Sequence, residues 1–486
     1  MRRPVIAGLT AIAAWTAHAG APYMATGIKT GEVTDNSAIV WTRLTAAETR
    51  VGPDAPIPIV RYRDPKTGAV DDATEGHPDR VPVLEYPNGV TVDQLEGAAP
   101  GATGQVRVVY TEHGINTWQE TAWFSVDPER DFTRQFNLTG LKPNTHYLLR
   151  AEARAKPDGP VTSELSGQFK TAPAPDMPAH VTFTVTTGQE YNDRDAPDGF
   201  RMYAAMTKLD PDFFVHTGDI VYYDKLAKTL PLARWHWQRM YSLPTDVEFH
   251  RYVPSYFIKD DHDTWMNDCW PTMQTKFMGE FTFVQGQAVF REQVPMGEKT
   301  YRTVRWGKDL QVWFVEGRDY RSPNDMPDSK DKTIWGAVQK DWFKRTVAAS
   351  DATFRVLVSP TPIVGPDRSA KNDNHANAGF QHEGDELRAF MAAQKNMVVV
   401  CGDRHWQYVS TDPTTGLREY SCGPASDAHA GGWPKDDVRP EHKYLNVCGG
   451  FLAITVNREN DKPVLIARHY SVDGTVLNED WIANNP

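Results

Sequence analysis

A proline-rich stretch divides the chain into two parts whose residue patterns predict different folds. Residues 171–178 (Thr-Ala-Pro-Ala-Pro-Asp-Met-Pro) cannot continue a sheet, because proline lacks the backbone N–H that a strand donates. The chain has 486 residues, too many for one hydrophobic core when domains usually contain ~100–200 residues. We therefore expect two domains, at 20–172 and 179–486, joined by a linker at 173–178.

The part before the linker predicts an all-β domain. Residues 37–44 and 105–110 mix or alternate β-branched, aromatic and polar residues as strands do, and turn residues such as those at 64–68 separate these segments. Residues 138–147 form a Leu…Leu-x-Pro-x-Thr-x-Tyr run that ends at Tyr147. This run resembles the fibronectin type III sandwich, in which the tyrosine hydroxyl bonds back to the chain. We expect a fibronectin III/Ig-like sandwich without clustered catalytic residues.

The part after the linker alternates strand and helix patterns. Residues 180–185 and 212–216 are apolar and β-branched, and the segment 199–209 between them has apolar residues at helical spacing. Strand, helix and strand predict a right-handed crossover, with ligands bound at the carboxyl ends of the strands. Residues 355–358 and 396–401 repeat the strand pattern. We therefore expect an α/β domain here.

Composition limits the partners of the chain. Hydrophobic residues make up 40% and charged residues 24%, as in an ordinary globular protein. The net charge of −11 argues against nucleic acids as general partners, because they are polyanions. After the N-terminal segment, no stretch approaches the ~18 uninterrupted apolar residues of a membrane span. We expect a monomer that neither binds nucleic acid specifically nor spans a membrane.

The N-terminus has the pattern of a secretory signal peptide over residues 1–19. Arg2 and Arg3 supply the positive region, residues 4–15 are mostly small and apolar, and Ala17-His-Ala is an A-x-A cleavage site. The alternative is a short buried helix. The arginine pair matches the twin-arginine signal poorly. We predict export to the periplasm or the extracellular space.

The four cysteines do not predict a zinc site. Cys269, Cys401, Cys422 and Cys448 form neither a CxxC pair nor any zinc-knuckle spacing. In an oxidising compartment a disulfide between Cys422 and Cys448 is one interpretation. Four buried thiols are the other, and sequence alone leaves both open.

Three segments place hard metal ligands directly after predicted strands, and the first is residues 215–222. Gly218 permits a tight turn, and Asp219 emerges at the end of the strand. A carboxylate at that place can bridge two cations, one through each oxygen. Tyr222 follows three residues later and offers a phenolate to a hard trivalent ion.

The second and third segments add acids and imidazoles. Residues 256–263 end in Asp-Asp-His-Asp, and residues 398–405 place Asp403 and His405 two positions apart. So many acids after an apolar strand are costly unless a positive group compensates them. Each motif alone is more typical of a turn than of a ligand. Together they predict a dinuclear metal site, which suits in-line displacement at phosphorus.

The order of these motifs is similar to that of the calcineurin-like metallophosphoesterases, and more narrowly to the alkaline phosphatase D (PhoD-like) family. The resemblance rests on Gly-Asp-x-x-Tyr at 218–222, Asp-Asp-His-Asp at 260–263, Arg-Asp-Tyr-Arg at 318–321 and Gly-Asp-x-His at 402–405. It covers nearly the whole mature chain. It implies a strand-rich N-terminal domain followed by a catalytic domain of two packed sheets flanked by helices.

The resemblance also implies roles for individual residues. Asp219 would bridge the two metals, Tyr222 would bind trivalent iron, and Asp261 would bind the second metal. His262 would donate a proton to the leaving group or steady the transition state. The family typically uses iron with calcium. The implied metal ligands in full are Asp219, Tyr222, Asp261, Asp403 and His405.

One position departs from the family pattern. The family usually has Ser-Cys-Gln after its first catalytic strand, with the cysteine on iron, whereas this chain has Thr-Gly-Gln at 187–189. Gly188 has no side chain with which to bind a metal. Gln189, Glu190 and Tyr191 are the candidate substitutes. Without a thiolate the first site becomes harder, and this weakens the assignment of iron.

The predicted reaction is hydrolysis of phosphoric monoesters, diesters or both by a metal-bound hydroxide. Gln189, Arg318 and Arg404 are candidate substrate-binding residues, and for each arginine the alternative is a structural ion pair. A different function is also open: a catalytically weakened carbohydrate- or surface-binding homologue that keeps the fold. The sandwich domain and Gly188 favour that alternative.

Two further features of the sequence are each consistent with a role in substrate binding or with a purely structural role. Residues 371–377 are polar, and they form either a substrate loop or a plain solvated loop. Trp235, Trp237 and Trp265 either wall a pocket for an aromatic or sugar leaving group or, by default, pack in the core.

Overall fold

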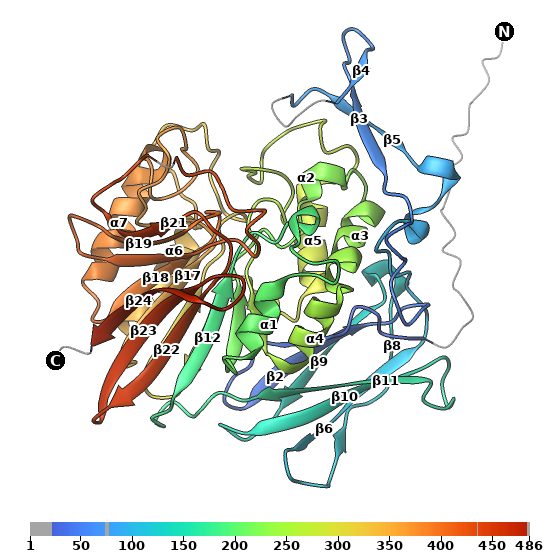
Figure 1. Cartoon of the computed structure of the whole chain (residues 1–486), viewed down its shortest axis with the longest axis horizontal. Helices are drawn as coiled ribbons and strands as arrows, with labels where there is room; N and C mark the ends of the chain where they lie inside the picture. The colour runs from blue at the N-terminus through green and yellow to red at the C-terminus, as the bar shows by residue number, and fades with distance from the viewer. Residues whose placement is uncertain (1–21, 73–76, 435, 484–486) are drawn as a thin grey trace.

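The computed structural model describes residues 22–72, 77–434 and 436–483. The predicted signal peptide at 1–19 therefore lies outside the described residues. Within the described ranges, no helix combines the length and the apolar character needed to span a membrane. The strands of the described residues form four sheets, and the two largest contain the strands that follow the predicted linker (Figure 1).

The first large sheet has nine strands and runs through both halves of the chain. Its central strands β12, β13 and β14 are parallel, and they are buried along their whole length. Near-continuous apolar sequence is typical of parallel strands covered on both faces. In spatial order the strands are β24 (Val476–Ala483), β23 (Lys462–Tyr470), β22 (Phe451–Glu459), β12 (Val181–Thr186), β13 (Phe213–His216), β14 (Ser255–Phe257), β1 (Ile28–Gly31), β2 (Ser37–Arg43) and β9 (Thr133–Thr139).

The second large sheet has seven strands, and its strands β16, β17, β18 and β20 are parallel. It packs against the central strands of the first sheet, because apolar residues of both sheets belong to one buried cluster. In spatial order its strands are β15 (Arg302–Trp306), β16 (Leu310–Phe314), β17 (Phe354–Ser359), β18 (Met397–Cys401), β20 (Arg418–Cys422), β19 (Gln407–Thr411) and β21 (His442–Asn446).

Helices cover the outer faces of the two large sheets, which gives the predicted pair of packed sheets flanked by helices. One buried cluster joins α6 and α7 to the seven-stranded sheet, and another joins α1, α3, α4 and α5 to the nine-stranded sheet. The α-helices are α1 (Arg201–Thr207), α2 (Tyr223–Leu226), α3 (Leu230–Tyr241), α4 (Pro244–Tyr252), α5 (Phe283–Gln293), α6 (Gly336–Ala348) and α7 (Gln381–Ala392).

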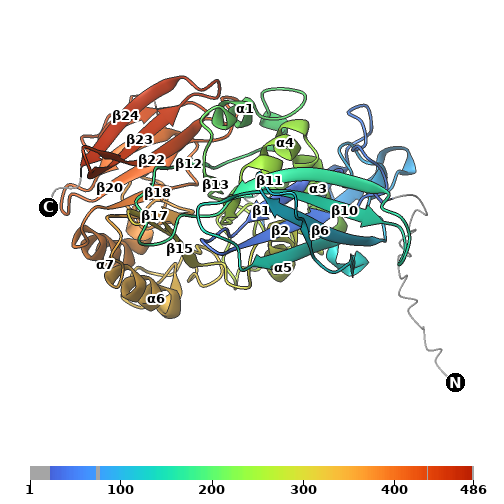
Figure 2. The ribbon, with the colours of Figure 1, turned by 90° about the horizontal axis from the view of Figure 1, so that it is seen from below.

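The predicted β-sandwich is present in the N-terminal part. A five-stranded sheet packs on β1, β2 and β9 through one apolar cluster (Figure 2). The backbone N–H of Lys142 donates to the Tyr147 hydroxyl over 2.9 Å, which is the predicted tyrosine corner. The sheet contains β11 (Ser163–Lys170), β10 (His146–Arg154), β6 (Gln105–Glu112), β7 (Gln119–Glu120) and β8 (Phe124–Ser125); a separate small sheet contains β4 (Val70–Asp71), β3 (Ile59–Arg63) and β5 (Val81–Glu85).

The N-terminal sandwich and the C-terminal part of the chain share one sheet. Strand β1 pairs in parallel with β14 at Gly31 and Ser255, and this pairing makes the nine-stranded sheet continuous. A Cβ atom at Gly31 would lie 2.6 Å from the carbonyl oxygen of Ser255, so only glycine permits this approach. The domain boundaries at 172 and 179 remain predictions. The hydrogen bonding of the sheet crosses from one predicted domain to the other.

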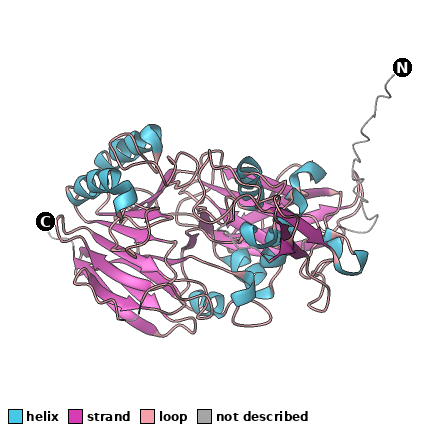
Figure 3. Ribbon diagram, turned by 90° about the horizontal axis from the view of Figure 1, so that it is seen from above, coloured by secondary structure: helices cyan, strands magenta, loops and turns pink. Residues whose placement is uncertain are grey.

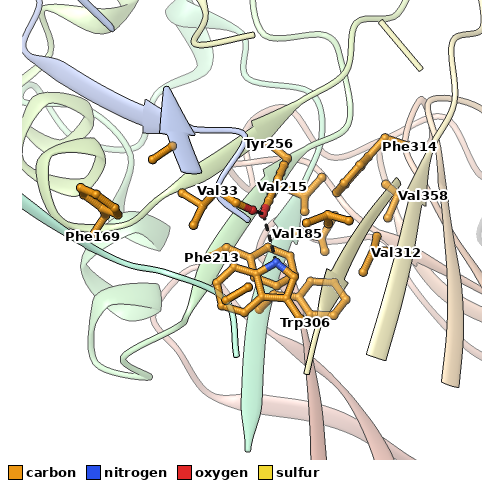
Figure 4. Packing of buried hydrophobic residues seen from close by; sticks show 14 of the residues in the cluster. Val33, Phe169, Val185, Phe213, Val215, Tyr256, Trp306, Val312, Phe314 and Val358 are labelled. Atoms are coloured by element: carbon orange, nitrogen blue, oxygen red, sulfur yellow. Dashed lines mark hydrogen bonds between the residues drawn. The ribbon is translucent and has the colours of Figure 1, made fainter. Parts of the chain in front are cut away.

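The main core lies between the two large sheets (Figure 4). Phe213 and Tyr256 come from the nine-stranded sheet, while Trp306 and Phe314 come from the seven-stranded one. The Phe213 and Trp306 ring centroids are 4.7 Å apart, and the Trp306 indole N–H donates to the Tyr256 hydroxyl over 3.0 Å. Near the C-terminus, Figure 3 shows a group of helices on one side of the strands. The packing between the two large sheets holds the carboxyl ends of β12, β13, β14 and β18 in place.

Candidate metal centre

The predicted ligands lie on tight turns that directly follow buried strands. Asp219 follows β13 with φ 56°, and Asp403 follows β18 with φ 63°. Both are non-glycine residues in the left-handed region, which costs about 1–3 kcal/mol each and is typical of functional sites. A Cβ atom at Gly218 (φ 111°) would lie 2.6 Å from the Cβ of Asp260. The glycine therefore lets the first and second motifs touch.

The carboxylates of three separate motifs converge on Asp219. Ligand atoms of Asp219, Asp261 and His262 all lie within 4.8 Å of one another, and so do those of Asp219, Asp260 and Asp403. Asp219 belongs to both sets, as a bridging carboxylate would. Its Oδ1 and the Oδ2 of Asp260 are buried and have no hydrogen-bond partner among the described residues. Unpaired buried carboxylate oxygens are costly, so this donor set fits a pair of bound cations.

Two histidines and a tyrosine form a second contact group that reaches Asp219 through His405. The Nε2 of His405 lies 3.5 Å from Oδ2 of Asp219 and 3.3 Å from the Tyr222 hydroxyl. The same hydroxyl lies 2.6 Å from Nε2 of His429, and Nδ1 of His429 lies 2.8 Å from Oδ2 of Asp193. Burial lowers the pKa of His405 well below its usual range, and the neighbouring His429 adds to this shift. The imidazole is therefore neutral, which is the form that binds metals.

Burial and mutual repulsion perturb the acids of the cluster. Burial raises the pKa of Asp219 well above its usual range, and the nearby charge of Asp261 raises it further. Burial also raises the pKa of Asp403 to about 7, although Arg404 opposes the shift. Burial would raise the pKa of Asp261 as well, but Arg318 and His262 outweigh it and the pKa is lowered. Adjacent carboxylates cannot all ionise easily without a cation among them.

Two buried guanidinium groups partly balance these acids. Nε of Arg318 lies 2.6 Å from Oδ1 of Asp260, and its Nη2 lies 3.7 Å from Oδ2 of Asp261. The side chain of Arg404 pairs with Asp403 at 2.5 Å. Both arginines are almost completely buried. They hold the carboxylates in place while leaving a surplus of negative charge.

His262 is fixed by a second acid. Its Nδ1 lies 2.8 Å from Oδ2 of Asp224, and its ring lies 4.3 Å from that of Tyr222. Burial would lower the pKa of His262, but Asp224 and Asp261 outweigh burial and raise the pKa well above 6.5. A carboxylate on one ring nitrogen fixes the orientation of the imidazole and leaves the other nitrogen for proton transfer.

Comparisons with known proteins agree with this arrangement. The family model described as PhoD-like phosphatase matches residues 183–433, and the one described as PhoD-like phosphatase, N-terminal domain matches residues 10–173. The chain belongs to the PhoD-like phosphatase family. This PhoD-like phosphatase is a metal-dependent phosphoric ester hydrolase, so the predicted reaction class is confirmed. A comparison with curated proteins found no match.

Two solved structures show the same fold as this PhoD-like phosphatase. A structure of PhoD aligns with a TM-score of 0.70 at 17% identity, covering 96% of this chain and 90% of that one. Purple acid phosphatase PPD1 from seeds of yellow lupin (Lupinus luteus) aligns with a TM-score of 0.60 at 13% identity, covering 94% of this chain and 74% of the other. The predicted two-part architecture is therefore confirmed.

The predicted ligands Asp219, Tyr222, Asp261, Asp403 and His405 lie in one cluster with His262, but the predicted substrate-binding residues do not line an open surface. Arg318 and Arg404 are committed to ion pairs, which favours the structural alternative for both. The amide of Gln189 donates to Asp246 over 2.7 Å, and its oxygen accepts from Tyr203 over 2.8 Å. Gln189 is fully buried, and the substrate-binding role predicted for it stays a prediction.

Tyr191 and Glu190, two candidates for replacing the family cysteine, contact different parts of the protein. The hydroxyl of Tyr191 lies 2.6 Å from Oε1 of Glu96 in the N-terminal part. Glu190 is buried, and its Oε2 pairs with Lys225 at 3.4 Å. Neither makes a direct contact with Asp219 among the interactions of the described residues.

The remaining open alternatives are also resolved. All four cysteines are free thiols, so Cys422 and Cys448 form no disulfide. Trp235, Trp237 and Trp265 are buried in the apolar cluster beneath α3 and α5, in agreement with core packing. The segment 371–377 is not a plain solvated loop, because Asp373 is buried and its Oδ2 lies 3.6 Å from Nη2 of Arg404.

Sequence reasoning missed residues that lie far from the three motifs. Asp224 is separated from His262 along the chain, and His429 lies in the loop after β20 without a Gly-Asp pattern. Asp193 lies in the loop after β12. A histidine or acid in a loop has no local signature. Only the short distance of His429 from Tyr222 identifies it.

Proposed function

We propose that this phosphatase cleaves phosphoric esters at a two-metal site in which Asp219 is the shared ligand. Asp219 carries the proposal because its carboxylate belongs to both groups of converging ligand atoms and has a buried oxygen without a hydrogen-bond partner among the described residues. Nε2 of His405 lies 3.5 Å from this carboxylate and 3.3 Å from the Tyr222 hydroxyl, and ligand atoms of Asp260, Asp261 and Asp403 lie within 4.8 Å of those of Asp219.

When bound there, two metal ions supply a nucleophilic hydroxide near neutral pH and stabilise charge on the phosphoryl oxygens. The chain contributes the positions of the ligands. Arg318 fixes Asp260 and Asp261, and Arg404 fixes Asp403, so the acids converge before any ion arrives. Iron with calcium, as the family resemblance implies, is the metal pair we propose, and elemental analysis of the purified protein tests it.

His262 is the proposed proton donor to the departing alkoxide. One nitrogen of its ring lies within the converging group that contains Asp219 and Asp261. The contact between its Nδ1 and Asp224 holds the ring in a single orientation. General acid catalysis of this kind typically contributes about 10²–10⁴-fold to the rate.

We propose that phosphodiesters are better substrates than phosphomonoesters. Arg318 and Arg404 are already paired with carboxylates, and Lys371 lies 3.0 Å from Asp268. These cations are therefore not free to neutralise the second negative charge of a monoester. Paired assays on p-nitrophenyl phosphate and bis-p-nitrophenyl phosphate measure the preference. A tenfold higher kcat/KM on the monoester would refute it.

The proposed location is the periplasm or the extracellular space. Residues 1–19 carry the charged, apolar and A-x-A regions of a signal peptide. Mass spectrometry of the protein recovered from an expressing cell should find an N-terminus at Gly20. The same sample tests the predicted monomer by light scattering.

A further inference from the structure

Gly188 leaves space beside two imidazole rings. Its backbone has φ 49°, and a Cβ atom built there would lie 3.0 Å from Nε2 of His405 and 3.1 Å from Cδ2 of His429. Any side chain at position 188 would have to push these rings away. The absence of a side chain at Gly188 therefore allows both imidazole rings to take their present positions.

The ring of His429 faces the same donor atoms as the ring of His405. The two ring centroids are 4.2 Å apart, and the Tyr222 hydroxyl lies 2.6 Å from Nε2 of His429 and 3.3 Å from Nε2 of His405. Ligands ~2.1 Å from one ion in a tetrahedral shell lie ~3.4 Å from one another. The separations of Nε2 of His405 from the Tyr222 hydroxyl (3.3 Å) and from Asp219 (3.5 Å) match such a shell. The 2.6 Å contact between Tyr222 and His429 is a hydrogen bond, and it would lengthen by less than about 1 Å if both atoms bound one ion.

The orientation of His429 is fixed from behind. Oδ2 of Asp193 lies 2.8 Å from Nδ1 of His429. Two backbone hydrogen bonds hold the loop that carries His429: the N–H of Ala425 donates to the carbonyl of Gly188 (3.1 Å), and the N–H of Gly431 donates to the carbonyl of His405 (2.9 Å). A carboxylate on the far nitrogen of a histidine is the usual support of a metal-bound imidazole.

We propose that His429 is a ligand of the first metal ion, with Asp193 as its positioning residue and Gly188 as the residue that makes room for it. This assignment rests on the proposed two-metal function. The first site then has two imidazole nitrogens, the Tyr222 oxygen and a carboxylate oxygen of Asp219 as its donors. An imidazole replaces the thiolate of the family pattern, so the site suits borderline divalent ions such as Zn²⁺ as well as iron.

The test uses the full-length protein stripped of metal and titrated with Zn²⁺ by calorimetry. His429→Ala should weaken the tighter of two binding events by more than ~100-fold, and Asp193→Asn should weaken it ~10–100-fold, as loss of a supporting carboxylate does. His442→Ala is the control, because His442 lies in β21 on the rings of Trp433 and Tyr408. It should bind Zn²⁺ as the unmodified protein does.

X-ray absorption of the Zn²⁺-loaded protein supplies a second measurement that does not depend on activity. The number of imidazoles on the first ion should fall from two to one in His429→Ala, and added imidazole should restore the affinity. Circular dichroism confirms that each variant is folded, and Asp193→Asn preserves the test if His429→Ala does not fold. Unchanged affinity and imidazole count in these variants, with metal still bound by the unmodified chain, would overturn the assignment of His429 alone. An unmodified chain that takes up no metal and cleaves no ester would overturn the proposed function itself.

Discussion

Two groups of residues near Asp219, which we call the acidic flank and the imidazole flank, differ in their chemistry. The acidic flank consists of Asp260, Asp261 and Asp403, and its charge is partly balanced by buried arginines. The imidazole flank consists of Tyr222, His405 and His429, whose donor atoms contact one another. The acidic flank depends on fixed positive charges for its folding, whereas the imidazole flank depends on close packing and on the absence of a side chain at Gly188.

Removing the residue that joins the flanks should have the largest effect. Asp219→Ala takes the shared ligand from both sites, so we expect loss of both metals and a fall in kcat/KM of more than about 10³-fold, because each ion contributes several kcal/mol. Elemental analysis and assays on the same sample measure both quantities. Asp473→Ala, at an exposed carboxylate, is the control. Full activity in Asp219→Ala would disprove the site.

A substitution at Arg318 perturbs the acidic flank without changing a residue of the imidazole flank. Arg318→Met leaves Asp260 buried without its partner, which should reduce the free energy of unfolding by about 3–5 kcal/mol. Urea denaturation of the metal-free protein measures this. Arg345→Met removes an exposed helix pair with Asp341 and should cost only about 0.3–0.5 kcal/mol. Equal losses in the two variants would show that the buried pair is not needed for folding.

His262 lies where the two flanks meet, and its removal should separate chemistry from metal binding. His262→Ala should keep both metals but lower kcat by about 10²-fold on p-nitrophenyl esters and by more on alkyl esters, whose leaving groups need the proton. Asp224→Asn should give a smaller loss with the same dependence on the leaving group. Parallel loss of metal and activity in His262→Ala would instead make this residue a ligand.

The last prediction concerns the buried polar network of Gln189, the residue that follows Gly188. Burial raises the pKa of Asp246 to about 7, although hydrogen bonds from Gln189 and Thr245 oppose the shift. The folded state therefore holds a proton that the unfolded state releases near pH 4, so stability falls as pH rises from about 4 to about 7, by at most about 1.4 kcal/mol per unit. Asp246→Asn should remove this contribution in urea denaturation at pH 5 and pH 8. Identical pH dependence in both proteins would contradict it.

The sequence was sufficient for the parts of the fold that have local signatures. The Leu…Leu-x-Pro-x-Thr-x-Tyr run that ends at Tyr147 predicted the sandwich, and apolar strands followed by Gly-Asp predicted where Asp219 and Asp403 emerge. The continuity of the sheet was missed, because it depends on one pairing, Gly31 with Ser255, between segments far apart in sequence. The buried position of Gln189 was not predicted, because its hydrogen-bond partners Asp246 and Tyr203 lie far from it in the sequence.

The partners of the motif residues could not be predicted for the same physical reason. Asp224 and His429 reach the site through tertiary packing, and neither carries a local pattern that separates a ligand from a surface residue. The arginines were visible as candidates, but only burial shows that Arg318 serves carboxylates within the protein.

The pairing of β1 with β14 determines how a fragment without the N-terminal part would behave. A fragment that starts at residue 179 would lack β1, β2 and β9, and it would present the bare edge of β14 with its unpaired backbone groups to water. Exposed edges of this kind recruit strands from other chains. The N-terminal sandwich therefore also acts as a built-in cover for the catalytic sheet, and we expect the isolated fragment to aggregate.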